Sequence, residues 1–314
     1  MARILFSGAG KYKKAIESYK QAILINPDYA KAHYNLGIVY GNSGDYQRAI
    51  ESYKQAILIK PDYAEAHCNL GVAYGNLGDY QKAIESYKQA ILIKPDLANA
   101  HSNLGTAYGA LGDYQKAIKS YKQAILIKPD YAEAHYNLGI AYGELGDYLK
   151  AIEFCKQAIR IEPDNAVAHC NLGVAYGNLG DYQKAIKSCK EAIRINPDYA
   201  KAHFNLGVTY GKTGDYQKAI ESYKQAIRIK PDYAKAHHNL GDAYGVLGDY
   251  QKEIESYKQA ILIKPDYAKA HCNLGAAYYK AGDRGGALEE YKILKDLDKK
   301  LADELFAIID GDKK

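Results

Sequence analysis

The chain contains eight prolines, and each lies 34 residues after the one before it, at Pro27, Pro61, Pro95, Pro129, Pro163, Pro197, Pro231 and Pro265. Self-similarity at a fixed period of about 20 to 50 residues is typical of a solenoid, in which each unit contacts only its neighbours. The period therefore predicts one small unit repeated along a line, and not a globular fold around a single core.

Histidine follows the same period. Eight of the nine histidines form one column, at His33, His67, His101, His135, His169, His203, His237 and His271. The repeat runs without a linker from Lys11 to about Leu301. We expect one elongated domain.

Composition narrows the class of function. The net charge of +5 comes from 42 basic and 37 acidic residues that alternate along the repeats, which argues against nucleic acid as a partner. No stretch has the 18 or so apolar residues of a membrane span, so no membrane insertion is expected. The five cysteines contain no C-x-x-C pair and are read as small apolar residues of a reducing compartment. A soluble, cytoplasmic protein is expected.

Residues Ala64 to Leu97 illustrate one repeat. Asp62 and Glu65 predict a capped helix start, and helical spacing of small and apolar residues continues to about Leu77. The pair Gly78-Asp79 predicts a turn followed by a second N-cap, and Pro95 ends the second helix. The expected repeat is helix, tight turn, helix, tight turn. The fold class is all-α.

These residues also carry a family resemblance. With Ala64 as position 1, the positions 7, 8, 11, 20, 24, 27 and 32 are Leu70, Gly71, Tyr74, Ala83, Tyr87, Ala90 and Pro95. This pattern resembles the tetratricopeptide repeat family. The resemblance implies a right-handed superhelical solenoid of antiparallel helix pairs. One departure is systematic, since position 4, usually tryptophan in the family, is histidine here.

The register divides the chain into units. A partial unit, with a first helix that is cut short, is expected at residues 1–29. Eight tandem units follow at 30–63, 64–97, 98–131, 132–165, 166–199, 200–233, 234–267 and 268–301. A capping helix and tail are expected at 301–314, with Leu301, Leu305, Ile308 and Ile309 facing inward and Lys299, Lys300, Asp303 and Glu304 facing water. Because the last unit lacks the proline, its second helix is predicted to run into the cap.

The resemblance implies a concave groove lined by the first helices, at positions 2, 5, 6, 9, 12 and 13. Position 6 is asparagine in every full unit, at Asn35, Asn69, Asn103, Asn137, Asn171, Asn205, Asn239 and Asn273. A carboxamide both donates and accepts, so this ladder can hold the main chain of an extended peptide. It is similar to the ladder in the tetratricopeptide arms of O-linked N-acetylglucosamine transferases. The alternative is a generic polar lining.

Glycine fills position 12 in seven units, at Gly41, Gly75, Gly109, Gly143, Gly177, Gly211 and Gly245. Inside a helix, glycine costs about 1 kcal/mol relative to alanine. One interpretation is that the missing side chains widen the groove for a ligand. The other is that the copies reflect duplication near a helix end, where the cost is small.

Two further groove positions bear on selectivity. Position 5 varies most, and its large aromatic members Tyr136 and Phe204 are candidate contacts. Position 2 becomes basic toward the C-terminus at Lys201, Lys235 and Lys269. We expect this half of the groove to receive an acidic segment or a free carboxylate, unless these lysines simply form a solvated face.

No catalytic site, metal site or cofactor is expected. The histidines of one column lie on successive helices, too far apart for ligands that must stand within about 2.3 Å of one zinc ion, so they are expected to pack. No G-x-S-x-G, P-loop or H-E-x-x-H motif is present.

The leading hypothesis is a non-enzymatic scaffold that binds a peptide segment of a protein partner in the groove. A second is a structural protein that self-assembles head to tail through its terminal helices, where the shortened first helix leaves an apolar end. Magnetosome-associated tetratricopeptide proteins resemble it in this respect. A third is the recognition arm of a larger enzyme.

Overall fold

The computed structural model describes residues 2–311, with side chains from Lys11 onward, and this part of the chain is entirely helical. The helices are α1 (Ala2–Ile25), α2 (Ala30–Asn42), α3 (Tyr46–Ile59), α4 (Ala64–Asn76), α5 (Tyr80–Ile93), α6 (Ala98–Ala110), α7 (Tyr114–Ile127), α8 (Ala132–Glu144), α9 (Tyr148–Ile161), α10 (Ala166–Leu179), α11 (Tyr182–Ile195), α12 (Ala200–Lys212), α13 (Tyr216–Ile229), α14 (Ala234–Val246), α15 (Tyr250–Ile263), α16 (Ala268–Lys280), α17 (Arg284–Leu297) and α18 (Lys299–Asp310). The all-α prediction is confirmed. Met1 and residues 312–314, which the sequence assigns to the opening unit and the tail, lie outside the described residues.

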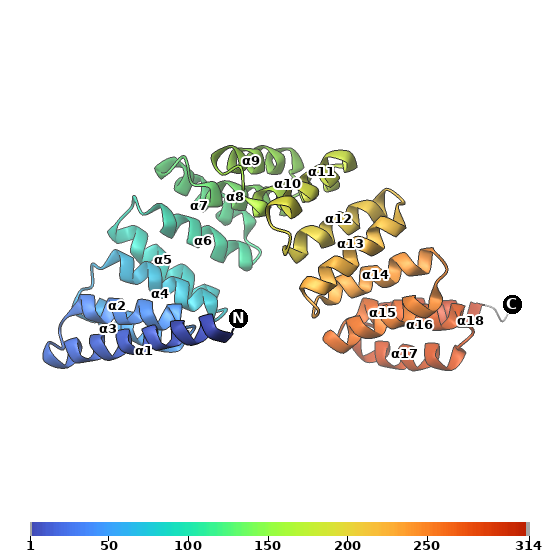
Figure 1. Ribbon diagram of the computed structural model, residues 1–314, viewed down its shortest axis with the longest axis horizontal. Helices are drawn as coiled ribbons and strands as arrows, with labels where there is room; N and C mark the ends of the chain where they lie inside the picture. The colour runs from blue at the N-terminus through green and yellow to red at the C-terminus, as the bar shows by residue number, and fades with distance from the viewer. Residues whose placement is uncertain (1, 312–314) are drawn as a thin grey trace. The chain divides into compact units, whose positions relative to one another are not determined.

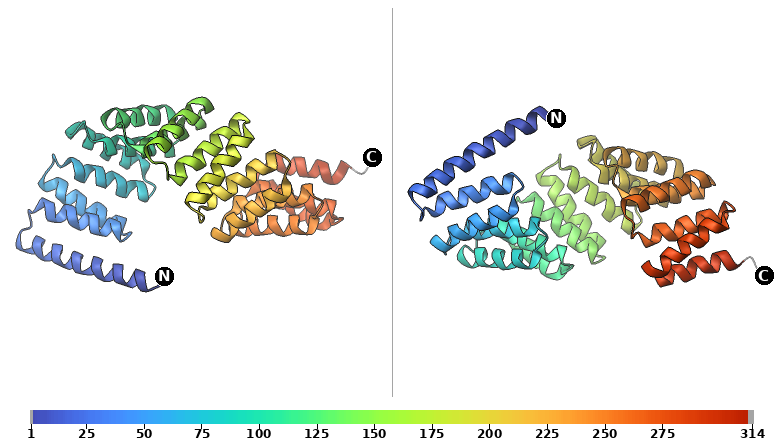
Figure 2. Two further views of the ribbon diagram at one scale, coloured as in Figure 1. Left: turned by 45° about the horizontal axis from the view of Figure 1, so that its top comes forward. Right: turned by 90° about the horizontal axis from the view of Figure 1, so that it is seen from below.

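The helices form two compact units, Met1–Glu162 and Pro163–Lys314, where the sequence predicted one elongated domain. Within each unit, consecutive helices pack as antiparallel pairs, and each pair packs on the next (Figures 1 and 2). Apolar clusters join neighbouring repeats: Tyr40, Ile50 and Tyr53 pack with Leu70 of the following repeat. The core of each unit is thus a series of small clusters, as expected when each repeat contacts only its neighbours.

The turn between the two helices of a repeat has the predicted chemistry. Gly78 has φ of +80°, a left-handed conformation in which only glycine avoids a steric penalty. The Asp79 carboxylate then accepts a hydrogen bond from the Lys82 backbone N–H at 3.2 Å and caps α5. The turn and the cap together reverse the chain direction within a few residues.

Position 8 sets how closely the two helices of a repeat approach each other. The Tyr87 ring of α5 lies so near the Gly71 backbone of α4 that a Cβ on Gly71 would stand 2.6 Å from Tyr87 Cε1. No real Cβ tolerates such a contact. Glycine at this position therefore allows the ring to fill the space between the helices.

The predicted cap at the start of the first helices is wrong. The N-cap of α4 is Tyr63, and it makes no side-chain capping bond. The helix starts at Ala64, one residue later than an Asp62 cap requires, which puts Glu65 out of register for the reciprocal bond.

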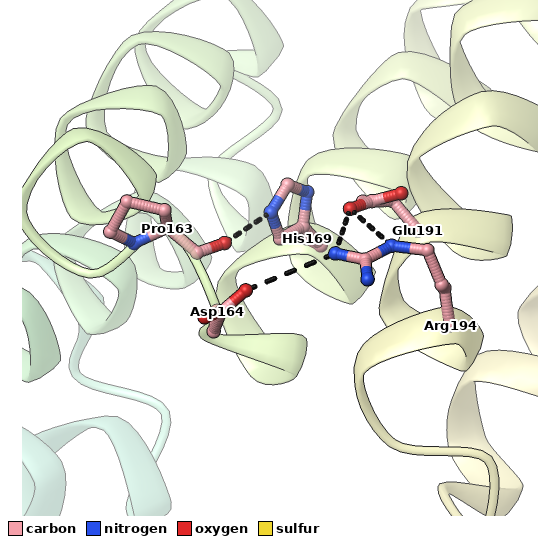
Figure 3. A network of polar contacts seen from close by, with 5 residues as sticks. All are labelled: Pro163, Asp164, His169, Glu191 and Arg194. Carbon is pink, nitrogen blue, oxygen red and sulfur yellow. Dashed lines mark hydrogen bonds and ion pairs between the residues drawn. The ribbon is translucent and has the colours of Figure 1, made fainter.

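The histidine column ties down this helix start. His67 Nε2 lies 3.0 Å from the Pro61 carbonyl oxygen, and all eight column histidines make the equivalent contact at 2.9 to 3.0 Å. Figure 3 shows it for His169 and Pro163, beside Arg194, which pairs with Glu191 at 2.8 Å and with Asp164 at 3.9 Å. The histidines thus have a structural role, as predicted. Each ring has a specific partner, the carbonyl oxygen of the proline six residues before it.

The opening segment differs from its prediction. One continuous helix, α1, spans Ala2–Ile25, where a short first helix and a turn were expected. Lys11 stands where the following repeat has the capping Asp45, and Gly10 has no left-handed φ. Without the cap, nothing stops the helix, so it continues through the position of the turn.

The C-terminal end also departs from the predicted continuous helix. Asp298 ends α17 and caps α18, accepting hydrogen bonds from the backbone N–H groups of Lys300 and Leu301 at 3.0 and 3.1 Å. An aspartate cap thus breaks the helix without a proline. On α18, Leu305 and Ile309 are buried as predicted, and Lys299, Lys300, Asp303 and Glu304 are exposed. Ile308 is exposed, contrary to prediction, because Ala302 completes the buried stripe with Leu305 and Ile309.

Candidate peptide-binding groove

Three pockets recur in the same register. One of about 360 Å³ lies among α2, α3 and α4, a second of about 270 Å³ among α4, α5 and α6, and a third of about 240 Å³ among α12, α13 and α14. Each is lined by positions 9, 12, 13, 17 and 24 of one repeat and positions 6, 9 and 10 of the next. We call these three sites the groove pockets.

Each groove pocket has a tyrosine wall that sequence reasoning missed. Tyr46 and Tyr53 line the first, Tyr80 and Tyr87 the second, and Tyr216 and Tyr223 the third. The signal was present, since both positions follow the 34-residue period, but a repeated aromatic reads equally well as core. Burial raises the pKa of Tyr223 to about 12, so its hydroxyl stays protonated and polar.

The position-12 glycines border open space. A Cβ added to Gly75 or Gly109 would meet no neighbouring atom within 4 Å, and one added to Gly41 would make ordinary contacts with Tyr53 Oη at 3.9 Å and Ala49 Cβ at 4.0 Å. Packing therefore does not demand glycine at these places. That the missing side chains serve a ligand stays a prediction beside the alternative of duplication.

The asparagine column lies at the seam between repeats. Asn69, Asn103 and Asn239 line the groove pockets. Asn35, Asn137, Asn205 and Asn273 are half-buried at the same register, while Asn171 is buried. The column is therefore not a fully exposed ladder.

Asn69 and Asn205 each use a carboxamide N–H inside the protein. Asn69 Nδ2 donates to the Tyr34 hydroxyl at 3.1 Å, and Asn205 Nδ2 contacts Cys170 Sγ at 3.2 Å. In both cases the acceptor is the position-5 side chain of the preceding repeat. One of the two N–H groups of each carboxamide is thereby engaged in the joint between repeats.

The prediction that position 5 lines the groove is wrong for most repeats. Cys68, Ser102 and Cys170 are at most 2% exposed, and His238 and Cys272 are also buried. Successive helical residues point about 100° apart, so position 5 turns away from the groove when position 6 borders it. Burial accordingly raises the pKa of the Cys68 thiol to about 11.

The two aromatic candidates at position 5 also sit in joints between helices. Phe204 packs between Tyr223 and Tyr233, with ring centroids 5.9 and 5.0 Å away. Tyr136 is half-buried, and desolvation raises its pKa to about 12. A direct contact of either ring with a ligand stays a prediction.

The basic candidates are on the surface. Lys201, Lys235 and Lys269 lie exposed in the first turns of α12, α14 and α16. Acidic groups also occur in this half, since Asp242 lines the third groove pocket with Lys212. A preference for acidic ligands stays a prediction.

No cluster of three or more His, Cys, Asp or Glu side chains suited to a metal ion occurs in the described part of the chain. Among the same residues, no helix combines the length and hydropathy needed to cross a bilayer. All five cysteines are buried, as small apolar substitutes should be.

Solved structures share the fold. A chain of the APC/C hetero-tetramer Cut9-Hcn1 matches with a TM-score of 0.67 and 19% identity, over 85% of this chain and 52% of that one, so this chain spans about half its length. A tetratricopeptide repeat protein from Parabacteroides merdae matches with a TM-score of 0.66 and 18% identity, over 79% and 98% of the two chains. MamA matches at 31% identity with a TM-score of 0.48, over 55% of this chain and 94% of MamA.

A search of curated proteins finds no match. Family models match most of the sequence. Those described as TPR repeat match residues 5–44, 42–78, 107–146 and 246–282, and those described as tetratricopeptide repeat match 64–97, 132–165, 164–232 and 222–255. Together with the paired helices and the 34-residue register, these matches identify the family. The chain belongs to the tetratricopeptide repeat family.

Proposed function

We propose that this protein is a non-enzymatic scaffold that binds extended peptide segments of a partner protein in the groove pockets of each unit. The observation that carries this proposal is the recurrence of open pockets with the same tyrosine, glycine and asparagine lining. Burying one valine- or leucine-sized side chain stabilises a complex by about 1.5 to 3 kcal/mol, so several shallow pockets in register suffice for specific binding.

The asparagines supply the polar part of the binding. One N–H of Asn69 Nδ2 is engaged with Tyr34, and we propose that Oδ1 accepts a hydrogen bond from a peptide N–H. Each such bond contributes about 0.5 to 1.5 kcal/mol, and this contribution does not depend on the side chains of the ligand. Lys201, Lys235 and Lys269 belong to the second unit, and we propose that they contact acidic residues of a segment bound at the third groove pocket.

The test starts from a phage-displayed library of random twelve-residue peptides selected on the full chain, followed by fluorescence anisotropy with the selected peptides. The triple variant Asn69→Ala, Asn103→Ala, Asn239→Ala should weaken binding by about tenfold or more. A matched control, Gln55→Ala, Gln89→Ala, Gln259→Ala, removes three exposed carboxamides outside the groove pockets and should bind normally. Equal affinity of the asparagine variant and the wild type would refute the groove as the site.

Head-to-tail self-assembly is a second candidate, favoured by apolar side chains at the terminal helices. Ile16 and Tyr19 of α1 are half-buried, whereas their equivalents Ile50 and Tyr53 are buried. Phe306 and Ile308 are exposed on α18. Light scattering across a hundredfold range of concentration tests this candidate: assembly should rise with concentration and fall in Phe306→Lys, and a monomer throughout would exclude it.

A further inference from the structure

The seventh repeat carries a carboxylate where every other repeat has alanine. Position 20 is Ala49, Ala83, Ala117, Ala151, Ala185, Ala219, Glu253 and Ala287 in chain order. Glu253 is 3% exposed. A Cβ on Gly245 would lie 2.5 Å from Glu253 Oε1, so the carboxylate occupies the space that stays open beside Gly75 and Gly109. The groove floor here is acidic.

The protein leaves this carboxylate poorly compensated. Glu253 Oε2 is buried and has no hydrogen-bond partner. The nearest cation, Lys280 Nζ, stands 3.9 Å from Oε1, too far for a hydrogen bond, and the Lys280 side chain is 52% exposed. A buried carboxylate without a close counter-charge is costly, and this burial raises the pKa of Glu253.

A second carboxylate, Asp242 at position 9, stands on the neighbouring helix α14. Its Oδ1 accepts hydrogen bonds from the Tyr257 hydroxyl at 2.7 Å and from Asn273 Nδ2 at 3.0 Å, and its Oδ2 lies 3.4 Å from His238 Nδ1. These contacts hold the carboxylate in place, yet its side chain is 46% exposed. The pair therefore combines a buried carboxylate with one that reaches solvent.

We propose that Asp242 and Glu253 form a subsite for one cationic side chain, a lysine ammonium or an arginine guanidinium, of the segment bound in the groove. The site rests on the proposed function for its ligand. Asp242 and Glu253 carry two negative charges, and Lys280 carries one positive charge. A cationic side chain of the ligand would supply the second positive charge. A metal ion is less suited, because no group of three His, Cys, Asp or Glu side chains among the described residues is arranged to hold one.

Charge-assisted hydrogen bonds give such a subsite its strength. Cationic donors pair with Asp242 at the solvent-accessible side and compensate Glu253 beneath it, which lets the exposed Lys280 turn to solvent. The other repeats, with alanine at position 20, offer no equivalent. The subsite thus sets which residue of the segment occupies the seventh repeat.

The test uses two small probes, n-butylammonium chloride and methylguanidinium chloride, titrated into the full chain while NMR follows the backbone amide of Gly245. Saturable shifts with one or both probes are expected, and the probe that binds more tightly identifies the lysine or arginine source. The dissociation constant should rise about tenfold or more in Glu253→Ala and in Asp242→Val. Both variants install residues that neighbouring repeats carry, Ala219 and Val208, so both should fold.

Glu255→Gln is the control, since it removes a carboxylate from an exposed position of the same helix. It should bind the probes like the wild type. Unsaturable shifts, or the same dissociation constant in Glu253→Ala, would overturn the subsite. This test is independent of the peptide selection. If the probes bind but no peptide is selected, only the groove proposal is refuted. If peptides are selected but the probes do not bind, only the subsite is refuted.

Discussion

Asn69 donates a hydrogen bond to the Tyr34 hydroxyl at 3.1 Å and thereby joins the second full repeat to the first. The Tyr34 ring also packs against Tyr53 and Tyr63, at centroid distances of 5.9 and 4.8 Å. One side chain of the asparagine column therefore holds the joint with an N–H group and also lines the first groove pocket.

The bond between Asn69 and Tyr34 can be measured with a double-mutant cycle. Asn69→Ala and Tyr34→Phe should each lower the free energy of unfolding by about 0.5 to 1.5 kcal/mol, with a coupling energy in the same range. Chemical denaturation of the four proteins gives the values. Tyr34→Phe should leave peptide capture intact, and a coupling energy near zero would contradict the bond.

Two neighbouring glycines of α4 should respond oppositely to alanine. Gly71→Ala forces a Cβ against the Tyr87 ring and should cost about 1 to 3 kcal/mol of unfolding free energy. Gly75→Ala meets open space and should gain about 0.5 to 1 kcal/mol from helix propensity, while it narrows the second groove pocket and weakens peptide binding. Denaturant titration tests the first effect and anisotropy the second; the same sign of stability change in both variants would contradict this assignment.

His101→Phe keeps an aromatic ring but loses the contact between Nε2 and the Pro95 carbonyl oxygen at 2.9 Å. The free energy of unfolding of this variant should be lower than that of the wild type by about 0.5 to 1.5 kcal/mol, because the Pro95 carbonyl loses its hydrogen-bond partner on the ring. Thermal unfolding of this variant beside the wild type checks it. An unchanged midpoint would show that the ring acts by packing alone.

Glu253 should make stability depend on pH. Its folded pKa is raised by burial, so the folded state favours the protonated form, and stability falls as pH rises from the unfolded value of about 4.3 through the folded pKa. At pH 7, Glu253→Ala should be more stable than the wild type by about 1 to 3 kcal/mol, with a smaller gain at pH 4. Denaturation at both pH values measures this, and Glu255→Gln should show no such trend. A gain that shrinks toward neutral pH would reverse the sign and reject the assignment.

Local chemistry explains which parts of the fold were predictable. Gly78 and Asp79 act through the backbone of their own turn, so their roles follow from residue type and neighbours. The errors at Asp62 and Asp298 also concern caps. Asp62 lies one residue too early in the chain to cap α4. Asp298 ends α17 without a proline.

The candidate site was less predictable. The columns of asparagine and glycine can be read from the sequence, and their role in binding stays a prediction. The partner of Asn69, the burial of Cys68 and the tyrosine walls depend on side chains from different helices. Glu253 is a single departure from alanine in its sequence column. Only the structure shows that its carboxylate is buried against Gly245.

The sequence by itself determined the repeat, the number of helix pairs and the turn chemistry, because a 34-residue period and local caps act within one unit. Only the tertiary structure decided which side of each first helix borders the groove and which enters the joint. The physical reason is that adjacent helical positions differ by about 100° in direction, and packing against the next repeat selects between them. Packing therefore places the asparagine column at the joint between repeats as well as beside the groove. It also buries Glu253, the one glutamate at a position that is otherwise alanine, next to Gly245.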